Sequence, residues 1–239
     1  MTLSSTLGPL RSTEPKDPNR KPLTSSYAAL MKAVTQAGLM RKRPAFYITL
    51  FVGLSLALGG LITGFVLIGD SWFQLLIAAG LGILLTQFAF ITHEASHRQV
   101  FASGKLNDWS GRILATAVVG ISYAWWMNKH TKHHINPNTV GKDPDIEWDT
   151  ISFQEVDAVK QKGFLRWITQ RQGYLFFPLL TLEGINLHFR SILTLFQKER
   201  LEGRAVELTL IALRLSAYVA VIFLFLPLGM AFAFLGVQL

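Results

Sequence analysis

Two long stretches without a charged residue lie next to each other in the first half of the chain. Residues 45–68 form a stretch of 24 residues, and residues 72–92 form one of 21. At about 1.5 Å per residue, an α-helix over either stretch is long enough to cross a hydrocarbon core of roughly 30 Å. The short segment 69–71 fits a turn between them. The two stretches therefore predict a transmembrane hairpin.

The composition points the same way, since 50% of the residues are hydrophobic and only 16% are charged, against about 25% charged in soluble domains. We predict an all-α fold, a polytopic membrane helical bundle. A third span is expected at 208–226, although Arg214 is costly in lipid unless it reaches a partner or the interface. Residues 113–127 are too short to span and are expected to be interfacial or re-entrant. We expect a polar loop over 129–172 and an amphipathic surface helix over 174–196.

Most of the basic charge precedes the first span. Residues 1–44 hold eight basic and two acidic residues, which is +6 of the net charge of +8. The positive-inside rule then places this end in the cytoplasm of a multi-pass protein of the cell membrane. The first 25 or so residues are rich in Ser, Thr and Pro, and we expect them to be disordered. We predict a basic, partly disordered arm over 1–44 and a membrane domain over 45–239, with lipid and no nucleic acid as its partner.

Five of the six histidines lie between His93 and His134. His93 and His97 are four residues apart where the second span ends, so a helix would place both imidazoles on one face. His130, His133 and His134 repeat this helical spacing. Imidazoles bind zinc, copper, iron and nickel, whereas the absence of cysteine excludes thiolate ligands and iron–sulfur clusters from the chain. The two clusters predict a histidine metal site at the cytoplasmic face.

Spacing alone leaves more than one class of metal site open. Residues 93–97 match the H-E-x-x-H motif of zinc metalloproteases, with Glu94 as the general base, so an intramembrane zinc protease is one alternative. It leaves the second histidine cluster unexplained. A non-catalytic metal-binding membrane protein is another, although the first two spans lack the ionisable groups of a transport path. Five histidines exceed the three protein ligands of a catalytic zinc, which favours two ions or one site with spectators.

Taken together, these motifs resemble the membrane fatty acid desaturase family, in its actinobacterial acyl-lipid or acyl-CoA type. The matching segments are THEASHRQ (92–99), NKHTKHHINPN (128–138), GKDPDIE (141–147) and LEGINLH (182–188). The resemblance implies O2-dependent insertion of a double bond into a long acyl chain by two non-haem iron ions at the cytoplasmic face. The iron ligands it implies are His93, His97, His130, His133 and His134. His188 is expected to be either a sixth ligand or a surface histidine of the amphipathic helix.

The resemblance also implies roles for residues around the metal. Glu94 and Asn186 are expected to orient ligand imidazoles rather than bind iron, and the acidic residues of 141–147 could do the same. Trp125 and Trp126 are expected either to flank an acyl tunnel or to belong to an interfacial aromatic belt. The resemblance gives none of these residues a direct part in bond breaking.

The same resemblance implies partners for the chain and a C-terminal histidine motif that this sequence lacks. The substrate is expected to be an acyl-CoA or a membrane lipid, with electrons from a separate ferredoxin- or cytochrome-like protein and its reductase. Members of the family carry another HxxHH-type box near their C-terminus, but no histidine follows His188 here. The last apolar run, 228–239, has 12 residues where a span needs about 20. We therefore expect the chain to be an incomplete fragment of the domain that is inactive by itself.

Overall fold

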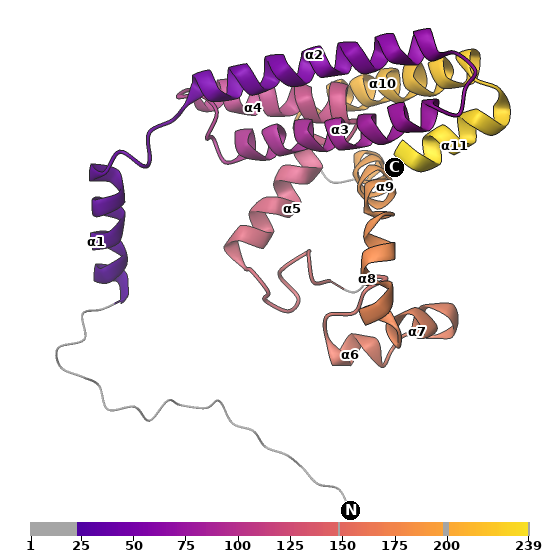
Figure 1. Cartoon of the computed structure of the whole chain (residues 1–239). Helices are drawn as coiled ribbons and strands as arrows, with labels where there is room; N and C mark the ends of the chain where they lie inside the picture. Colours follow the sequence, from indigo (N-terminus) through magenta and orange to yellow (C-terminus); the bar gives the residue numbers. More distant parts are fainter. Residues whose placement is uncertain (1–22, 148, 198–200, 239) are drawn as a thin grey trace, which may run out of the picture. The chain divides into compact units, whose positions relative to one another are not determined.

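A computed structural model of the chain describes residues 23–147, 149–197 and 201–238 (Figure 1). The chain divides into two units, 1–41 and 42–239. The described part of the first unit is mainly one helix, α1 (Leu23–Gln36). The disorder predicted for the first 25 or so residues thus lies almost entirely outside the described residues, and the predicted division at residue 44 stays a prediction.

The predicted hairpin is present as two long apolar helices, α2 (Pro44–Ile68) and α3 (Gln74–Ser96), which pack along each other (Figure 1). Both helices are long and apolar enough to cross a membrane. The side chain of Gln74 is fully buried at the turn, where its amide nitrogen donates hydrogen bonds to the carbonyl oxygens of Phe65 (2.7 Å) and Gly69 (2.9 Å). These bonds satisfy carbonyl groups that the end of α2 leaves without helical partners.

The predicted third span is also present, as α10 (Arg204–Phe225), and its length and hydropathy again suit a membrane crossing. The shorter α11 (Leu228–Gln238) follows it and packs against α3. The described residues thus form the all-α membrane bundle that the sequence predicts. The buried cluster at this end consists of Phe65, Ala78, Ile222, Leu226, Met230, Ala231 and Phe234.

Between the second and third spans the chain first runs through three short helices. They are α4 (Gly104–Ile113), the π-helix η1 (Leu114–Val119) and α5 (Tyr123–Ile135). Gly120 ends the π-helix with a left-handed backbone, φ +96°, a conformation that costs glycine little because it has no Cβ. None of the three is long enough to cross a bilayer, which agrees with the prediction that residues 113–127 do not span.

The π-helix packs against α3 and also receives Arg214 of α10. The Arg214 Nε–H donates to the carbonyl oxygen of Val118 (3.1 Å), and its guanidinium lies 4.8 Å from the centre of the Tyr218 ring. The charge expected to be costly in lipid is therefore held against protein groups. The buried cluster here consists of Leu84, Phe88, Ile91, Leu114, Ala115, Val119, Ile121 and Tyr123.

The segment 129–196 is more helical than predicted. The expected loop over 129–172 begins inside α5 and contains two short helices, α6 (Glu155–Ala158) and α7 (Gly163–Thr169). The single helix expected over 174–196 is two helices, α8 (Gln172–Leu180) and α9 (Glu183–Phe196).

The break between α8 and α9 follows Pro178, which lies inside α8 and has no N–H to donate. The hydroxyl of Thr181 donates to the Pro178 carbonyl oxygen at 2.6 Å, and the Leu182 N–H donates to Leu179 at 3.0 Å. These short-range bonds close the last turn of α8 instead of extending it. The expectation of one continuous helix was wrong for this local reason.

We expect Phe88→Ala to lower the free energy of unfolding by about 3–5 kcal/mol, the usual cost of emptying a buried aromatic site. Phe88 is 2% exposed and packs edge-on against Phe51 at 6.1 Å between ring centres. Unfolding in mixed detergent and dodecyl sulfate micelles measures this. Phe90→Ala is the matched control, because Phe90 lies on the same helix with 59% of its surface exposed. Equal losses in both variants would contradict the packing described here.

Candidate metal centre

The last turn of α3 carries the first histidine pair. His93 and His97 lie on one face, with 4.7 Å between their ring centres, as the i, i+4 spacing predicts. The helix stops there because Arg98 takes a left-handed conformation, φ +56°, and donates its N–H to the Ala95 carbonyl oxygen at 2.8 Å. Both imidazoles therefore lie at the end of a membrane helix, where the chain leaves the apolar bundle.

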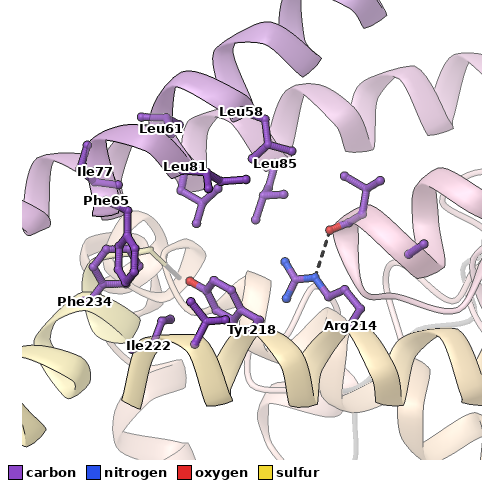
Figure 2. A pocket seen from close by; sticks show the side chains of 14 residues that line it. Leu58, Leu61, Phe65, Ile77, Leu81, Leu85, Arg214, Tyr218, Ile222 and Phe234 are labelled. Atoms are coloured by element: carbon purple, nitrogen blue, oxygen red, sulfur yellow. Dashed lines mark hydrogen bonds between the residues drawn. The ribbon is translucent and has the colours of Figure 1, made fainter. Parts of the chain in front are cut away.

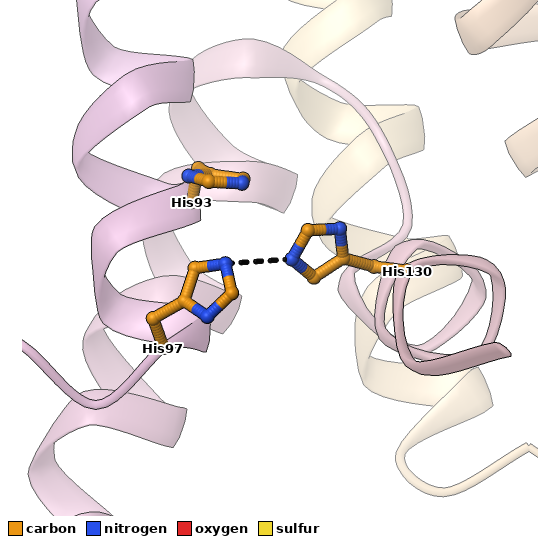
Figure 3. Close-up of side chains that lie close together, drawn as sticks. All are labelled: His93, His97 and His130. Carbon is orange, nitrogen blue, oxygen red and sulfur yellow. Dashed lines mark hydrogen bonds between the residues drawn. The ribbon is translucent and has the colours of Figure 1, made fainter. Parts of the chain in front are cut away.

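Helix α5 brings a second pair of imidazoles to the first. The His130 ring centre lies 4.8 Å from those of His93 and His97, and the His134 ring centre lies 4.4 Å from His130 and 4.8 Å from His97. Figure 3 shows His130 facing the two histidines of α3. The four rings form two triangles that share the His97–His130 edge. Across that edge the two Nε2 atoms are 2.9 Å apart.

Trp126 covers one side of this cluster. Its ring stacks on that of His130, with 5.0 Å between centres and an interplanar angle of 18°, and lies 6.2 Å from that of His93. One turn of α5 separates Trp126 from His130, so the stacking follows from helical spacing. The structure thus places this tryptophan against the histidines, while the role predicted for Trp125 stays a prediction.

His133 turns toward a buried carboxylate instead of joining the other four rings. Its Nδ1 lies 3.0 Å from both side-chain oxygens of Asp143, which is fully buried, and 3.2 Å from an oxygen of Asp145. The backbone N–H groups of Asn138 (2.6 Å) and Asp145 (2.9 Å) also donate to Asp143. With its Nδ1–H donating to this carboxylate, His133 keeps the Nε2 lone pair for a metal ion, a common arrangement around ligand histidines.

The surroundings set the protonation of these groups. Burial by itself would raise the pKa of Asp143, but the hydrogen bonds from Asp145, Asn138 and His133 outweigh it, and the pKa lies below its usual value. Burial, followed by repulsion from neighbouring imidazoles, lowers the pKa of His97 and lowers that of His130 to about 4. At neutral pH Asp143 is therefore ionised, while His97 and His130 are uncharged and able to bind a metal ion.

The donor atoms fit a transition metal ion. Two nitrogens bound about 2.1 Å from one ion, at roughly a right angle, are about 3 Å apart, which matches the 2.9 Å between the Nε2 atoms of His97 and His130. The potential ligand atoms of His93, His97 and His130 all lie within 4.8 Å of one another, and the same holds for His133, Asp143 and Asp145. Imidazole donors suit iron, zinc and copper alike.

The structure does not bring His188 to the other histidines. It lies on α9, with Nδ1 2.7 Å from the Gly184 carbonyl oxygen and Nε2 3.1 Å from that of Val119 in the π-helix. Asn186 donates to the Glu183 carboxylate of its own helix at 3.1 Å. Both ring nitrogens of His188 are thus occupied by backbone groups, and the ligand and orienting roles expected for these two residues stay predictions.

Glu94 lies between His93 and the first long helix. One of its oxygens accepts a hydrogen bond from the Tyr47 hydroxyl on α2 at 3.1 Å, and the other lies 3.7 Å from Nδ1 of His93. The predicted hairpin brings the first and second spans together, but helical spacing gives no signal that the Tyr47 hydroxyl meets Glu94. The arrangement connects Glu94 to α2 and leaves its predicted orienting role a prediction.

Glu207, like Tyr47, makes a contact near the site that was not predicted from the sequence. It lies in the first turn of α10, is fully buried, and contacts the beginning of α5. The available signal was a carboxylate directly before an apolar span, where a charge needs a partner if it is buried. Its partner, the beginning of α5, is 83 residues away and could not be predicted from helical spacing.

An apolar pocket of about 300 Å³ lies among the spanning helices (Figure 2). Side chains from α2, α3, η1, α10 and α11 line it, including Leu58, Leu81 and Ile222. Figure 2 shows Arg214 and Tyr218 as its polar lining residues, with Arg214 bonded to the backbone of η1. The pocket's chemistry suits a hydrocarbon chain.

Comparison with known proteins matches residues 70–239 to the family profile described as fatty acid desaturase. A Delta(8)-fatty-acid desaturase of Helianthus annuus is 28% identical over 205 residues, covering 81% of this chain and 45% of the relative. An acyl-lipid (9-3)-desaturase of Borago officinalis is 30% identical over 143 residues, covering 54% and 31%. A Delta 8-(E)-sphingolipid desaturase of Kluyveromyces lactis is 28% identical over 182 residues, covering 71% and 31%.

The chain thus spans less than half the length of these curated relatives. No solved structure matches it. The comparisons therefore bear on its family, while its arrangement in space comes from the structure described above.

We expect Asp143→Asn to weaken metal binding by about 10–100-fold, the usual effect of removing a carboxylate that orients a ligand histidine. The amide cannot hold the Nδ1–H of His133 and accept both backbone N–H groups as the carboxylate does. Titration of the purified chain with Fe²⁺ in detergent, without oxygen, measures the change. Asp157→Asn is the control. Among the described residues, the Asp157 side chain on α6 pairs only with Lys160, just after that helix. Unchanged affinity in Asp143→Asn would contradict the role assigned to it.

Proposed function

The chain belongs to the fatty acid desaturase family, and on that basis we propose that its histidine motifs hold two non-haem iron ions for O2-dependent desaturation of a long acyl chain. The observation that carries the proposal is the meeting of four imidazoles from α3 and α5 at the end of a membrane helix. Relatives named as desaturases are oxidoreductases, which agrees with this class of reaction.

Some of these residues would bind the metal ions, and others would hold the binding residues in place. His93, His97, His130 and His134 would bind metal directly, and His133 would bind through Nε2 while Asp143 holds its orientation. Trp126 would keep water from one side of the cluster. When bound, the two iron ions would supply the oxygen-activating redox chemistry that removal of hydrogen from an unactivated C–H bond requires.

The substrate proposal rests on the apolar pocket and on the relatives. The pocket of about 300 Å³ is lined almost wholly by hydrocarbon side chains and offers room for part of an acyl tail. Relatives are named for fatty acids, acyl lipids and sphingolipids. We propose an acyl chain carried by CoA or by a membrane lipid as the substrate, with electrons from a separate ferredoxin- or cytochrome-like donor and its reductase.

The zinc protease alternative fits the geometry less well. In that mechanism the glutamate of the H-E-x-x-H motif must reach the metal-bound water as a general base. Here the Glu94 carboxylate accepts a hydrogen bond from Tyr47 instead. A fourth imidazole, that of His134, lies against His97 and His130, beyond the three protein ligands of a catalytic zinc. Both observations support the desaturase proposal.

We expect the purified chain, loaded with iron in the absence of zinc, to bind iron as a coupled pair, because without a competing ion the tighter binding of zinc by imidazole ligands plays no part. A coupled iron pair would show in the Mössbauer spectrum of the ⁵⁷Fe-loaded chain, whereas a protease site would hold one zinc. His130→Ala should abolish this signature, because His130 contacts each of the other three clustered rings. Thr131→Ala, at the exposed neighbouring position of α5, serves as the control. A single uncoupled iron, or no bound iron, in the loaded chain would overturn the proposal.

We also propose that the N-terminus and both histidine motifs face the cytoplasm. The basic cluster at 41–43 precedes the first span, while the turn at 69–71 carries no basic residue. In this cysteine-free chain, Asp70→Cys in intact cells should react with a membrane-impermeant maleimide. Ala102→Cys, just beyond the His93–His97 pair, should react only after the cells are opened. The reverse labelling pattern would contradict the orientation.

A further inference from the structure

A buried carboxylate holds the beginning of the helix that carries His130 and His134. Glu207 of α10 is fully buried and accepts a hydrogen bond from Nη1 of Arg112 (2.5 Å) and another from the Ser122 hydroxyl (2.5 Å). The backbone N–H of Ala124 lies 3.1 and 3.3 Å from its two oxygens. One side chain thus connects the end of α4, the start of α5 and the start of α10.

These contacts complete the cap of α5. Ser122 is the N-cap residue, and its hydroxyl oxygen accepts the Trp125 N–H at 3.1 Å. The Ala124 N–H, which has no partner within the helix, is satisfied by Glu207 from outside it. A negative charge here also interacts favourably with the positive end of the helix dipole. The first turn of α5 is therefore held by a residue 83 positions away in the sequence.

Beyond its first turn, α5 is held by packing against α9 and by two polar contacts, of Lys129 with Asp145 and of His133 with Asp143. Tyr123 is its one buried residue, while the positions from Ala124 onward are half-buried or exposed. His130 lies seven residues beyond Tyr123, about 10 Å along the helix axis. A 10° tilt about the first turn would move His130 by about 2 Å, whereas a binding site needs its ligands placed within about 0.5 Å.

We propose that Glu207 is a positioning residue that sets the placement of α5 and thereby keeps His130 and His134 against His93 and His97. The inference rests on the proposed metal centre and assigns Glu207 no contact with metal or substrate. It adds a contact from α10, the third span, to a site otherwise built from α3 and α5.

The residues around Glu207 hold its partner Arg112 and the Tyr123 ring in close contact. The guanidinium of Arg112 also donates to the Glu202 carbonyl oxygen at 2.9 Å. On the preceding residue, Gly111, a Cβ would lie 2.7 Å from the Tyr123 ring, so a larger residue would displace that ring. A buried ion pair of this kind adds little net stability compared with apolar packing, yet losing one partner leaves an uncompensated charge. Fixing an arrangement is therefore a better account of Glu207 than raising stability.

The test compares Glu207→Gln with Glu202→Gln. An amide at 207 offers one acceptor oxygen to three donors and leaves Arg112 without its counter-charge. Glu202→Gln removes the same charge from an exposed side chain five residues earlier. Two quantities are measured on the full chain in detergent: the Co²⁺ dissociation constant, and the distance distribution between spin labels at Gln87→Cys on α3 and Thr131→Cys on α5 without metal.

We expect Glu207→Gln to weaken Co²⁺ binding by about 10–100-fold and to broaden the label distribution, with Glu202→Gln matching the wild type in both. Ser122→Ala, a milder change, should shift both readouts in the same direction. Because the two residues act through one junction, the combined variant should lose less affinity than the sum of the single losses.

The outcomes separate a positioning role from a structural one. A lower unfolding temperature of Glu207→Gln with unchanged Co²⁺ affinity and an unchanged label distribution would overturn the proposal. If Glu207→Gln fails to fold, the same two readouts on Ser122→Ala decide it. Absence of Co²⁺ binding by the wild type would count against the proposed function, while the label distribution would still support or overturn the positioning role.

Discussion

The candidate metal centre depends on how α5 is held relative to α3. The chain reaches α5 through the π-helix η1 and the left-handed Gly120, where regular helical hydrogen bonding is interrupted. In an apolar environment, backbone groups released by such an interruption need other partners. They find them in Arg214 for the Val118 carbonyl oxygen and in Glu207 for the Ala124 N–H. The irregular segment is thus stabilised by polar residues of α10.

This pattern gives a physical reason for charged residues in an apolar helix. Arg214 and Glu207 are costly in or near a bilayer unless they are paired. In the structure both contact the segment between α4 and α5, Glu207 through Ser122 and Arg214 through Val118. Because that segment leads directly to α5, the same contacts position the second pair of histidines. Stabilisation of the irregular backbone and assembly of the candidate centre therefore depend on the same residues.

The candidate centre combines an apolar interior with a polar edge. The pocket lies among the spanning helices, whereas the histidines lie where α3 ends and where α5 is half-buried or exposed. This separation is consistent with the proposed reaction, in which an acyl chain in the membrane would meet iron, oxygen and electrons supplied from the aqueous side. His133 with Asp143 extends the histidine cluster toward the polar loop, where hydrogen bonds keep the carboxylate ionised.

The sequence by itself determined what depends on neighbours along one helix. The lengths of the uncharged stretches predicted the three spans, and the i, i+4 spacing predicted that His93 pairs with His97 and His130 with His134. These features follow from the rise and periodicity of the helix. Only the tertiary structure decided that the two pairs meet, that His133 turns to Asp143 and that Glu94 contacts Tyr47. These contacts depend on how separate helices are placed, and that placement depends on long-range bonds, such as Glu207 to Ala124, that helical periodicity does not encode.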